Sequence, residues 1–231
     1  MDKSTFVVNQ EIVDEILRYS SFLVKRGYVC NQLGNIAIRE QRESSLDGDF
    51  IYTKHKGLSL EEIYPQNIVV KDLMTDNLVF GDTEPSIGYQ MNREIFRCSP
   101  CTNAIIHLHV NVLIAYFSTM RCPRAFRFIS AGAPIVINKP IVILDPEVNV
   151  ESDVSCISGL VDSTNILVMP NHGVTVFDSS LSSAYHKINT LVAEVARIIE
   201  ATKIASLVGS SVNYLSDDVV KELALLSSTI L

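Results

Sequence analysis

Two histidines one residue apart stand inside an apolar run, Ile105-Ile106-His107-Leu108-His109-Val110, that is typical of a β-strand. Because side chains alternate faces along a strand, His107 and His109 point the same way and the residue between them points to the other face. A third histidine, His172, lies in a predicted turn between two further apolar runs. Three imidazoles from these places would hold a divalent metal ion and leave one coordination position open. That arrangement is typical of a catalytic zinc site rather than a structural one.

A second interpretation of these histidines is open. A single histidine beside apolar residues is commonly a core side chain with hydrogen-bonded partners, and this applies to His172 taken alone. His107 and His109 fit it less well, because two neighbouring imidazoles in an apolar strand both need polar partners. Together the three residues favour a metal site. Imidazole does not select the metal, since zinc, iron, cobalt, nickel and copper all accept it.

Composition limits the class of protein and its partners. The 231 residues show no sharp change of composition, so we expect one domain over residues 1–231. With 47% hydrophobic and 19% charged residues, and no apolar run of about twenty residues, the chain is predicted to be globular without a membrane span. Its first residues resemble no secretory signal, which predicts a cytoplasmic protein. A net charge of −7 without a basic cluster argues against nucleic acid and favours a small-molecule ligand.

The cysteines do not indicate a disulfide framework. There are five, an odd number, at positions 30, 98, 101, 122 and 156, and we expect thiols. Cys98-Ser99-Pro100-Cys101 has the spacing of a redox or metal-binding pair. No second pair exists and no strand-then-helix pattern surrounds it, so a loop with two incidental cysteines is the favoured interpretation.

Hydrophobic periodicity predicts alternating helices and strands. Helices are predicted from a cap at Asn9 to a stop at Gly27, from Ser86, over Asn111–Met120, from Ser179 to Gly209, and after a cap at Ser216. Strands are predicted at Ile36–Ile38 and Phe50–Tyr52 as a hairpin, at Ile68–Val70, at Leu78–Phe80, and over Pro134–Leu144 with breaks at the prolines. The residues Lys54–Lys56 are predicted to form a charged loop.

Five blocks in order resemble the class II aldolase and adducin family: Gly34–Arg39, Thr53–Gly57, Glu84–Ser86, His107–His109 and Asn171–Gly173. Its members include fuculose-phosphate aldolase, ribulose-phosphate 4-epimerase and methylthioribulose-phosphate dehydratase. The resemblance, over about residues 10–200, implies an α/β (α+β) fold in which helical layers flank a mostly antiparallel central sheet. It implies a divalent ion on the three histidines, zinc by family habit, with Fe²⁺, Mn²⁺ and Co²⁺ as alternatives. It also implies a homotetramer with active sites at subunit interfaces.

The chain departs from the family pattern where a catalytic glutamate is expected. In the family this glutamate directly follows a Pro-Ser-Ser segment, and here the stretch is Pro85-Ser86-Ile87-Gly88, so its position falls on Gly88. Glycine cannot exchange a proton, and a general base typically contributes about 100- to 10,000-fold to the rate. Ile87 also replaces a serine that helps to hold the substrate phosphate, and Asn92 replaces a frequent histidine. The departures concentrate on one wall of the expected pocket.

What remains of the expected phosphate cradle is Asn35, Gly57 and Ser86, and Lys56 stands where the aldolases usually have a small hydroxyl residue. A lysine at position 56 could bind a phosphate or carboxylate as a point charge, although a solvated loop is the alternative for Lys54–Lys56. Gly34 could mark close approach of the backbone to a ligand or only a turn into a strand. Tyr89 and Glu84 are the nearest substitutes for the missing base, and we assign that role to neither. The expected substrate-binding residues are Asn35, Lys56, Gly57 and Ser86.

These observations predict an aldolase-like, divalent-metal-dependent lyase. It would act on a small phosphorylated hydroxy-carbonyl compound through a metal-stabilised enediolate. A divergent member with epimerase, dehydratase, decarboxylase or iron-dependent chemistry is an alternative, with a base recruited elsewhere. An ordinary aldolase with a base from a neighbouring subunit is another. A non-catalytic oligomeric scaffold like adducin is also open, because a fold does not determine activity.

Overall fold

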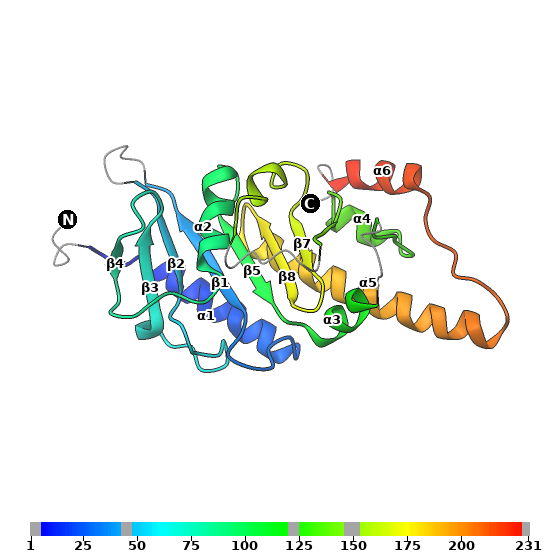
Figure 1. The fold of residues 1–231 in the computed structure, drawn as a ribbon, viewed down its shortest axis with the longest axis horizontal. Helices are drawn as coiled ribbons and strands as arrows, with labels where there is room; N and C mark the ends of the chain where they lie inside the picture. The colour runs from blue at the N-terminus through cyan, green and yellow to red at the C-terminus, as the bar shows by residue number, and fades with distance from the viewer. Residues whose placement is uncertain (1–5, 43–47, 120–124, 146–152, 228–231) are drawn as a thin grey trace.

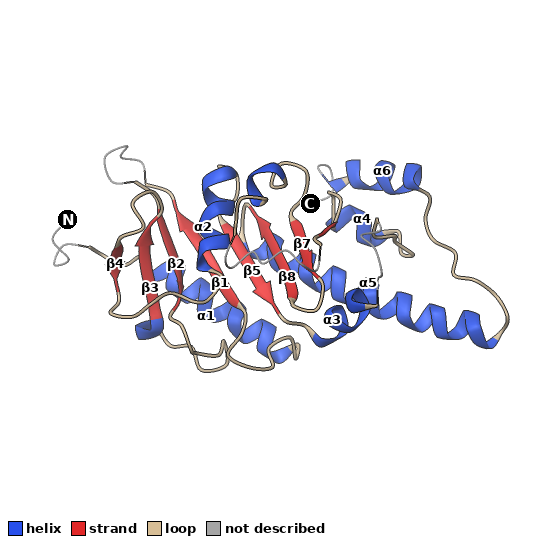
Figure 2. Ribbon diagram, in the orientation of Figure 1, coloured by secondary structure: helices blue, strands red, loops and turns tan. Residues whose placement is uncertain are grey.

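A computed structural model describes residues 6–42, 48–119, 125–145 and 153–227. Its centre is an eight-stranded sheet of order β4-β3-β2-β1-β5-β8-β7-β6, drawn in red in Figure 2. All neighbouring strands are antiparallel except β6 and β7, which are parallel. The predicted mixed α/β fold with a mostly antiparallel sheet is therefore confirmed. The strands are β1 (Asn35–Glu40), β2 (Phe50–Lys54), β3 (Ile68–Asp72), β4 (Leu78–Phe80), β5 (Ala104–Leu108), β6 (Val142–Ile143), β7 (Ile166–Met169) and β8 (Gly173–Asp178).

Helices cover both faces of this sheet, as Figures 1 and 2 show. On one face lie α1 (Gln10–Lys25), α3 (Asn111–Ser118) and α5 (Leu181–Leu207), which share a core with β1 residues such as Ile36. On the other face α2 (Tyr89–Cys98) and the 3₁₀ turn η3 (Ile157–Gly159) pack on a second core that includes Ile105 of β5. Because strand residues alternate faces, His107 shares the α2 face with Ile105.

The helix boundaries follow the predicted capping signals. The side chain of Asn9 accepts a hydrogen bond from the backbone N–H of Glu11, and Gly27 after the helix end has φ 72°. Ser216 caps α6 (Asp217–Leu225), which has no buried residue and lies beside α4 beyond the end of the sheet (Figure 1). None of the described helices is long and apolar enough to cross a membrane.

Three predicted boundaries are wrong. Pro134–Leu144 is not a continuous β segment, because α4 (Gly132–Val136) precedes the short β6. Pro134 fits the first turn of that helix, where a missing N–H breaks no intrahelical bond. Helix α2 begins at Tyr89 rather than Ser86, since Gly88 has a left-handed φ of 83°. Lys54 belongs to β2 and is buried, so Lys54–Lys56 is not wholly a loop.

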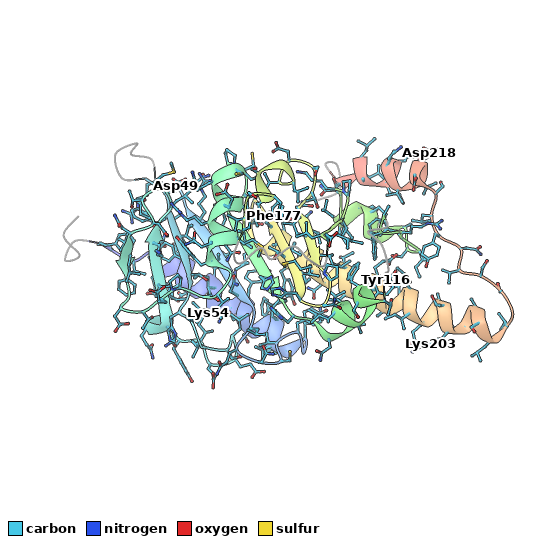
Figure 3. The ribbon with its side chains drawn as sticks, in the orientation of Figure 1. Asp49, Lys54, Tyr116, Phe177, Lys203 and Asp218 are labelled. Atoms are coloured by element: carbon cyan, nitrogen blue, oxygen red, sulfur yellow. The ribbon has the colours of Figure 1, made fainter. Side chains whose placement is uncertain are left out.

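The blocks of the expected site meet at one edge of the sheet. Antiparallel neighbours run in opposite directions, so the beginning of β1 and of β8 lie beside the end of β2 and of β5. Figure 3 labels Lys54 at this edge and Phe177 near the other end of β8. The 3₁₀ turn η2 (Pro65–Asn67) precedes β3 at the same edge. The fold thus brings together residues that are far apart in the sequence.

Candidate metal centre

Strand β5 presents the first two histidines at the sheet edge. It is flanked by β1 and β8, so that His107 pairs with Asn35 on one side and Thr175 on the other. His107 is 5% exposed, and His109, just past the strand end, is half-buried. The strand alternation inferred from the sequence therefore directs both imidazoles to one region.

A tight turn brings the third histidine to the same place. The backbone N–H of His172 donates to the carbonyl of Met169 over 3.1 Å, which closes the turn between β7 and β8. Pro170 at its second position and Asn171, with φ 62°, at its third are the residues that a type II turn prefers. The predicted turn at this place is confirmed, and it sets His172 opposite His109.

The three imidazoles converge. One ligand nitrogen from each of His107, His109 and His172 lies within 4.8 Å of the other two. The Nε2 atoms of His107 and His109 are 2.9 Å apart, and the ring centroid of His172 lies 5.3 Å from that of His107 and 4.7 Å from that of His109. Zinc–nitrogen bonds of about 2.0 Å place two tetrahedral ligands about 3.3 Å apart, so the three residues fit a divalent ion.

Burial keeps His107 and His109 in the form that can bind a metal ion. Desolvation holds the pKa of His107 well below its usual range, and the two neighbouring imidazoles lower it further. Burial, followed by the effect of His172, lowers the pKa of His109 to about 4. Both rings are therefore neutral at pH 7, and a neutral imidazole has the lone pair that a metal ion requires.

Thr175 contacts His107, the most buried of the three histidines. Its Oγ1 lies 2.9 Å from Nδ1 of His107, and its hydroxyl donates to Sδ of Met91 over 3.8 Å. The threonine oxygen then accepts the Nδ1 proton of His107 and leaves Nε2 free to bind an ion. The sequence reasoning missed this residue. Its signal was weak: Thr175 is the one polar residue in the apolar run Val174–Phe177.

Two glycines allow the strands beside β5 to approach the histidines. A Cβ on Gly173 would lie 2.5 Å from the carbonyl oxygen of Leu108 and 3.4 Å from Cε1 of His107. A Cβ on Gly34, whose φ is 87°, would lie 2.9 Å from the carbonyl oxygen of His107. The close approach at Gly34 is therefore to the backbone of β5. A side chain at either position would force β5, the strand that bears His107, away from its neighbours.

The expected substrate cradle consists of two segments that pair through their backbones. Lys56 donates its N–H to the carbonyl of Glu84, and Ser86 donates its N–H to the carbonyl of Lys54, each over 2.9 Å. Lys56 and Gly57 are exposed in a turn, whereas Ser86 is buried. The structure thus brings these two blocks together. Binding of substrate by Lys56, Gly57 and Ser86 stays a prediction.

Asn35 lies beneath this cradle and is fully buried. Its Oδ1 accepts a hydrogen bond of 2.7 Å from Nδ2 of Asn92, and its own Nδ2 donates to the carbonyl of Ile87 over 3.3 Å. The chain of amides links β1, α2 and the Pro85–Gly88 segment. It places that segment next to the strand that pairs with His107.

The geometry agrees with an independent comparison of the sequence. A family model for the class II aldolase and adducin N-terminal domain matches residues 14–199. The chain belongs to the class II aldolase and adducin family. The fold and the three-histidine cluster are those that the family resemblance led us to expect.

Individual relatives of this class II aldolase family member are moderately similar to it. The L-fuculose phosphate aldolase of Methanococcus maripaludis is 27% identical over 80% of this chain and 93% of its own length. The 3-oxo-tetronate 4-phosphate decarboxylase of Haemophilus influenzae is 26% identical over 86% of this chain and 89% of its own. A solved L-fuculose 1-phosphate aldolase shares the fold with a TM-score of 0.76 at 17% identity, over 96% of this chain and 97% of the other.

The class II aldolase resemblance places the catalytic glutamate at Gly88, and this assignment stays a prediction. Gly88 caps α2, and its carbonyl accepts the N–H of Asn92 over 3.2 Å. A Cβ built on it would have Nδ2 of Asn35 as its nearest neighbour, at 3.6 Å. Gly88 therefore lies close to Asn35, the residue that pairs with His107 across the sheet. The position offers room for a side chain but supplies no proton donor.

Tyr89 and Glu84 are the two residues nearest to Gly88 that could act as an acid or base. The ring of Tyr89 is buried and packs under Nζ of Lys71, 4.9 Å from the ring centre, on β3. Two strands separate β3 from the histidine strand, and burial raises the pKa of Tyr89 far above its usual value. Glu84 is exposed and contributes its backbone carbonyl to the cradle. The role of the base is therefore assigned to neither residue.

Proposed function

We propose that this chain is a divalent-metal-dependent carbon–carbon lyase acting on a small phosphorylated hydroxy-carbonyl compound. The observation that carries the proposal is the convergence of three imidazole ligands within 4.8 Å of one another, at the sheet edge that also bears the Lys56–Gly57 turn. The aldolase and the decarboxylase among its relatives are both named for reactions that break a carbon–carbon bond. Zinc is the metal that we propose.

The ion would supply a Lewis acid that stabilises negative charge as it develops on a substrate oxygen. The chain's own groups have separate tasks. His107, His109 and His172 would hold the ion, and Thr175 keeps the proton of His107 on Nδ1. The exposed ammonium group of Lys56 would attract the phosphate as a point charge.

Gly88 favours a second candidate reaction, the decarboxylation of a phosphorylated 3-oxo acid. Cleavage of an aldol requires a base that removes a proton from the substrate hydroxyl. Loss of carbon dioxide requires none: the bond to the carboxylate carbon breaks, its electron pair moves toward the 3-oxo group, and water later supplies a proton to carbon. A site without a glutamate at position 88 can therefore support this reaction more easily.

We also propose that the chain forms one domain and works as a homo-oligomer, a tetramer by family resemblance. The apolar side chains of Ile204, Leu207 and Val208 at the end of α5 are 59%, 85% and 69% exposed. Helix α6 adds Val219, which is 40% exposed. Burial of such side chains against another subunit would remove apolar surface from water. The mass of the particle in solution tests this proposal.

Metal content and a substrate panel test the proposed function. Protein purified without added metal should contain about one zinc ion per chain, as three-histidine sites do. His109→Ala should lose the metal, whereas the matched control His186→Ala, at an exposed position on α5, should keep it. Fuculose 1-phosphate, ribulose 5-phosphate and 3-oxo-tetronate 4-phosphate then separate aldol cleavage, epimerisation and decarboxylation.

The outcomes differ for each hypothesis. Carbon dioxide release without aldol cleavage identifies a decarboxylase, and the reverse result identifies an aldolase. A chain that binds no metal contradicts the proposal. A chain that binds zinc and turns over none of these compounds supports an adducin-like scaffold instead.

A further inference from the structure

A cavity of about 490 Å³ lies in the helical layer on the opposite face of the sheet from the metal centre. Its walls come from the end of α1, from the start of α4 with the loop before it, and from α5. These helices pack on the core of one sheet face, whereas His107 lies on the other face with α2. Figure 1 shows α1 and α5 behind the sheet and α2 in front of it. The volume is that of a small-molecule site.

Two arginines give this cavity a positive charge. Arg26, directly after the end of α1, and Arg197 on α5 both line it. Arg197 has one acidic partner, since its Nη1 lies 3.2 Å from Oε2 of Glu194. Within the described part of the chain, Arg26 interacts with the phenol of Tyr185 and forms no ion pair with a carboxylate. The cavity therefore carries excess positive charge on a chain whose formal net charge is −7.

The carboxylate of Glu194 is satisfied largely by groups other than Arg197. Glu194 is fully buried, and its Oε1 accepts the N–H groups of Ile129 and Ser130 over 2.6 and 2.9 Å. Its Oε2 accepts the hydroxyl of Ser130. A guanidinium group has five N–H donors, so Arg197 keeps donors for a ligand while it contacts Glu194. The same bonds tie the loop before α4 to α5 and fix two walls of the cavity relative to each other.

Neutral polar side chains complete the lining. Ser130, Asn189 and Thr190 all border the cavity. The Oδ1 atom of Asn189 is buried and accepts no hydrogen bond from the described residues. A buried acceptor without a donor is unfavourable. A bound molecule with a hydroxyl group would supply a donor at this wall once the amide turns toward the cavity.

We propose that this cavity is a second ligand site, for a small organic anion that carries a hydroxyl group. Guanidinium groups bind carboxylates and phosphates through paired hydrogen bonds, so Arg26 and Arg197 would hold the anionic group. Asn189 and Thr190 would hydrogen-bond the hydroxyl. The molecule would bind without contacting the metal centre, because the sheet lies between them. This inference does not depend on the proposed function.

Calorimetry on the full chain tests the inference with two probes. Malate offers carboxylates and a hydroxyl group, and glycerol 3-phosphate offers a phosphate and hydroxyl groups. The main variant is Arg26→Gln/Arg197→Gln. We expect the dissociation constant of at least one probe to rise about tenfold or more, as the loss of hydrogen bonds from a charged donor predicts. Arg26→Gln alone leaves the ion pair of Glu194 intact and should weaken the same probe, in case the double variant does not fold.

Arg18→Gln/Lys203→Gln is the matched control. Arg18 is an exposed arginine on α1, and Lys203 is an exposed cation on α5. The Nζ atom of Lys203 lies 2.8 Å from Oε1 of Glu200, three residues earlier, as Arg197 pairs with Glu194. Neither Arg18 nor Lys203 is among the residues that line the cavity. The control removes two positive charges from the same two helices and should keep the probe affinity.

The outcomes separate the possible sources of binding. Binding of malate alone identifies a carboxylate ligand, and binding of glycerol 3-phosphate alone identifies a phosphate ligand. The inference is overturned if the wild-type chain binds neither probe, if the arginine variants bind as tightly as wild type, or if the control loses as much affinity. A loss of affinity in His109→Ala would also overturn it, because the anion would then bind at the metal centre.

Succinate tests the role of the hydroxyl group. It has the two carboxylates of malate without the hydroxyl, so it should bind more weakly than malate if Asn189 and Thr190 contact that group. Equal affinities would overturn the part of the inference that concerns these two residues.

Discussion

Replacement of Thr175 by valine should weaken metal binding without disturbing the fold. The two side chains have nearly the same shape, so the substitution removes a hydroxyl and leaves the packing of β8 intact. Thr175 Oγ1 is the acceptor that lies 2.9 Å from Nδ1 of His107, and His107 is 5% exposed. Water cannot easily replace the lost acceptor at so buried a position.

The expected effect depends on which ring nitrogen of His107 carries the proton. If the proton stays on Nδ1, the buried donor has no partner and the free energy of unfolding falls by about 1–3 kcal/mol. If the proton moves to Nε2, it occupies the nitrogen that faces His109 and must be displaced before an ion can bind. Loss of such an orienting partner weakens metal binding about 10- to 100-fold, or about 1.4–2.7 kcal/mol.

Competition with a chromophoric chelator measures the zinc dissociation constant of each variant. Thr53→Val is the matched control, because Thr53 is fully buried on the same face and its hydroxyl donates to the carbonyl of Ile36 over 2.8 Å. Thr53→Val should lose stability but keep its zinc affinity. A zinc dissociation constant for Thr175→Val within about twofold of wild type, against the tenfold minimum expected, would refute the proposed role of Thr175.

Three further predictions concern stability. Desolvation lowers the pKa of Lys54 from 10.5 to about 8. Between pH 8 and 10.5 the unfolded chain binds more protons at Lys54 than the folded chain, so the contribution of Lys54 to the free energy of unfolding should rise with pH by up to about 3 kcal/mol. Burial raises the pKa of tyrosines such as Tyr52, which has the opposite effect near pH 10 in both chains, so urea titrations should show the rise as a difference in pH slope between wild type and Lys54→Met; equal pH slopes would contradict it. Gly88→Ala should lower the free energy of unfolding by about 1–2 kcal/mol, because the φ of 83° at this position is unfavourable for alanine even though the added Cβ has room. An unchanged urea midpoint would argue against a left-handed conformation at Gly88. Gly173→Ala should lower it by about 3 kcal/mol and weaken zinc binding, since its Cβ would meet Leu108 at 2.5 Å. Gly159→Ala, with no atom within 4 Å of its Cβ, should do neither, and equal effects at both glycines would exclude the steric explanation.

Local signals predicted much of the fold correctly. Three features depend only on residues that are close together in the sequence, and the sequence predicted them: the cap at Asn9, the hairpin of β1 and β2, and the apolar stripe of α5. The segment at Pro134 was predicted wrongly, because a proline is compatible both with a break in a strand and with the first turn of a helix. Which one forms depends on packing against the rest of the chain.

Charged side chains were the least predictable part of the site. Lys54, His55 and Lys56 resemble a solvated loop as a sequence, yet Lys54 is 1% exposed while Lys56 is exposed. Two backbone carbonyls accept hydrogen bonds from the ammonium group of Lys54 and so lower the cost of its burial. The sequence alone does not show where those carbonyls lie. The sequence did not identify the hydrogen-bond partner of His107 either, because Thr175 is 68 residues away along the chain.

The sequence by itself predicted the three histidines that could bind a metal ion, and the structure brings them together. Strand alternation was enough to direct His107 and His109 the same way, since it depends only on local backbone geometry. The tertiary structure decided which groups surround those ligands: Thr175 on the neighbouring strand, the glycines that allow close approach, and the buried ammonium group of Lys54. Orientation, burial and charge at the site arise from segments that meet only when the sheet is assembled, and residue order does not specify them directly.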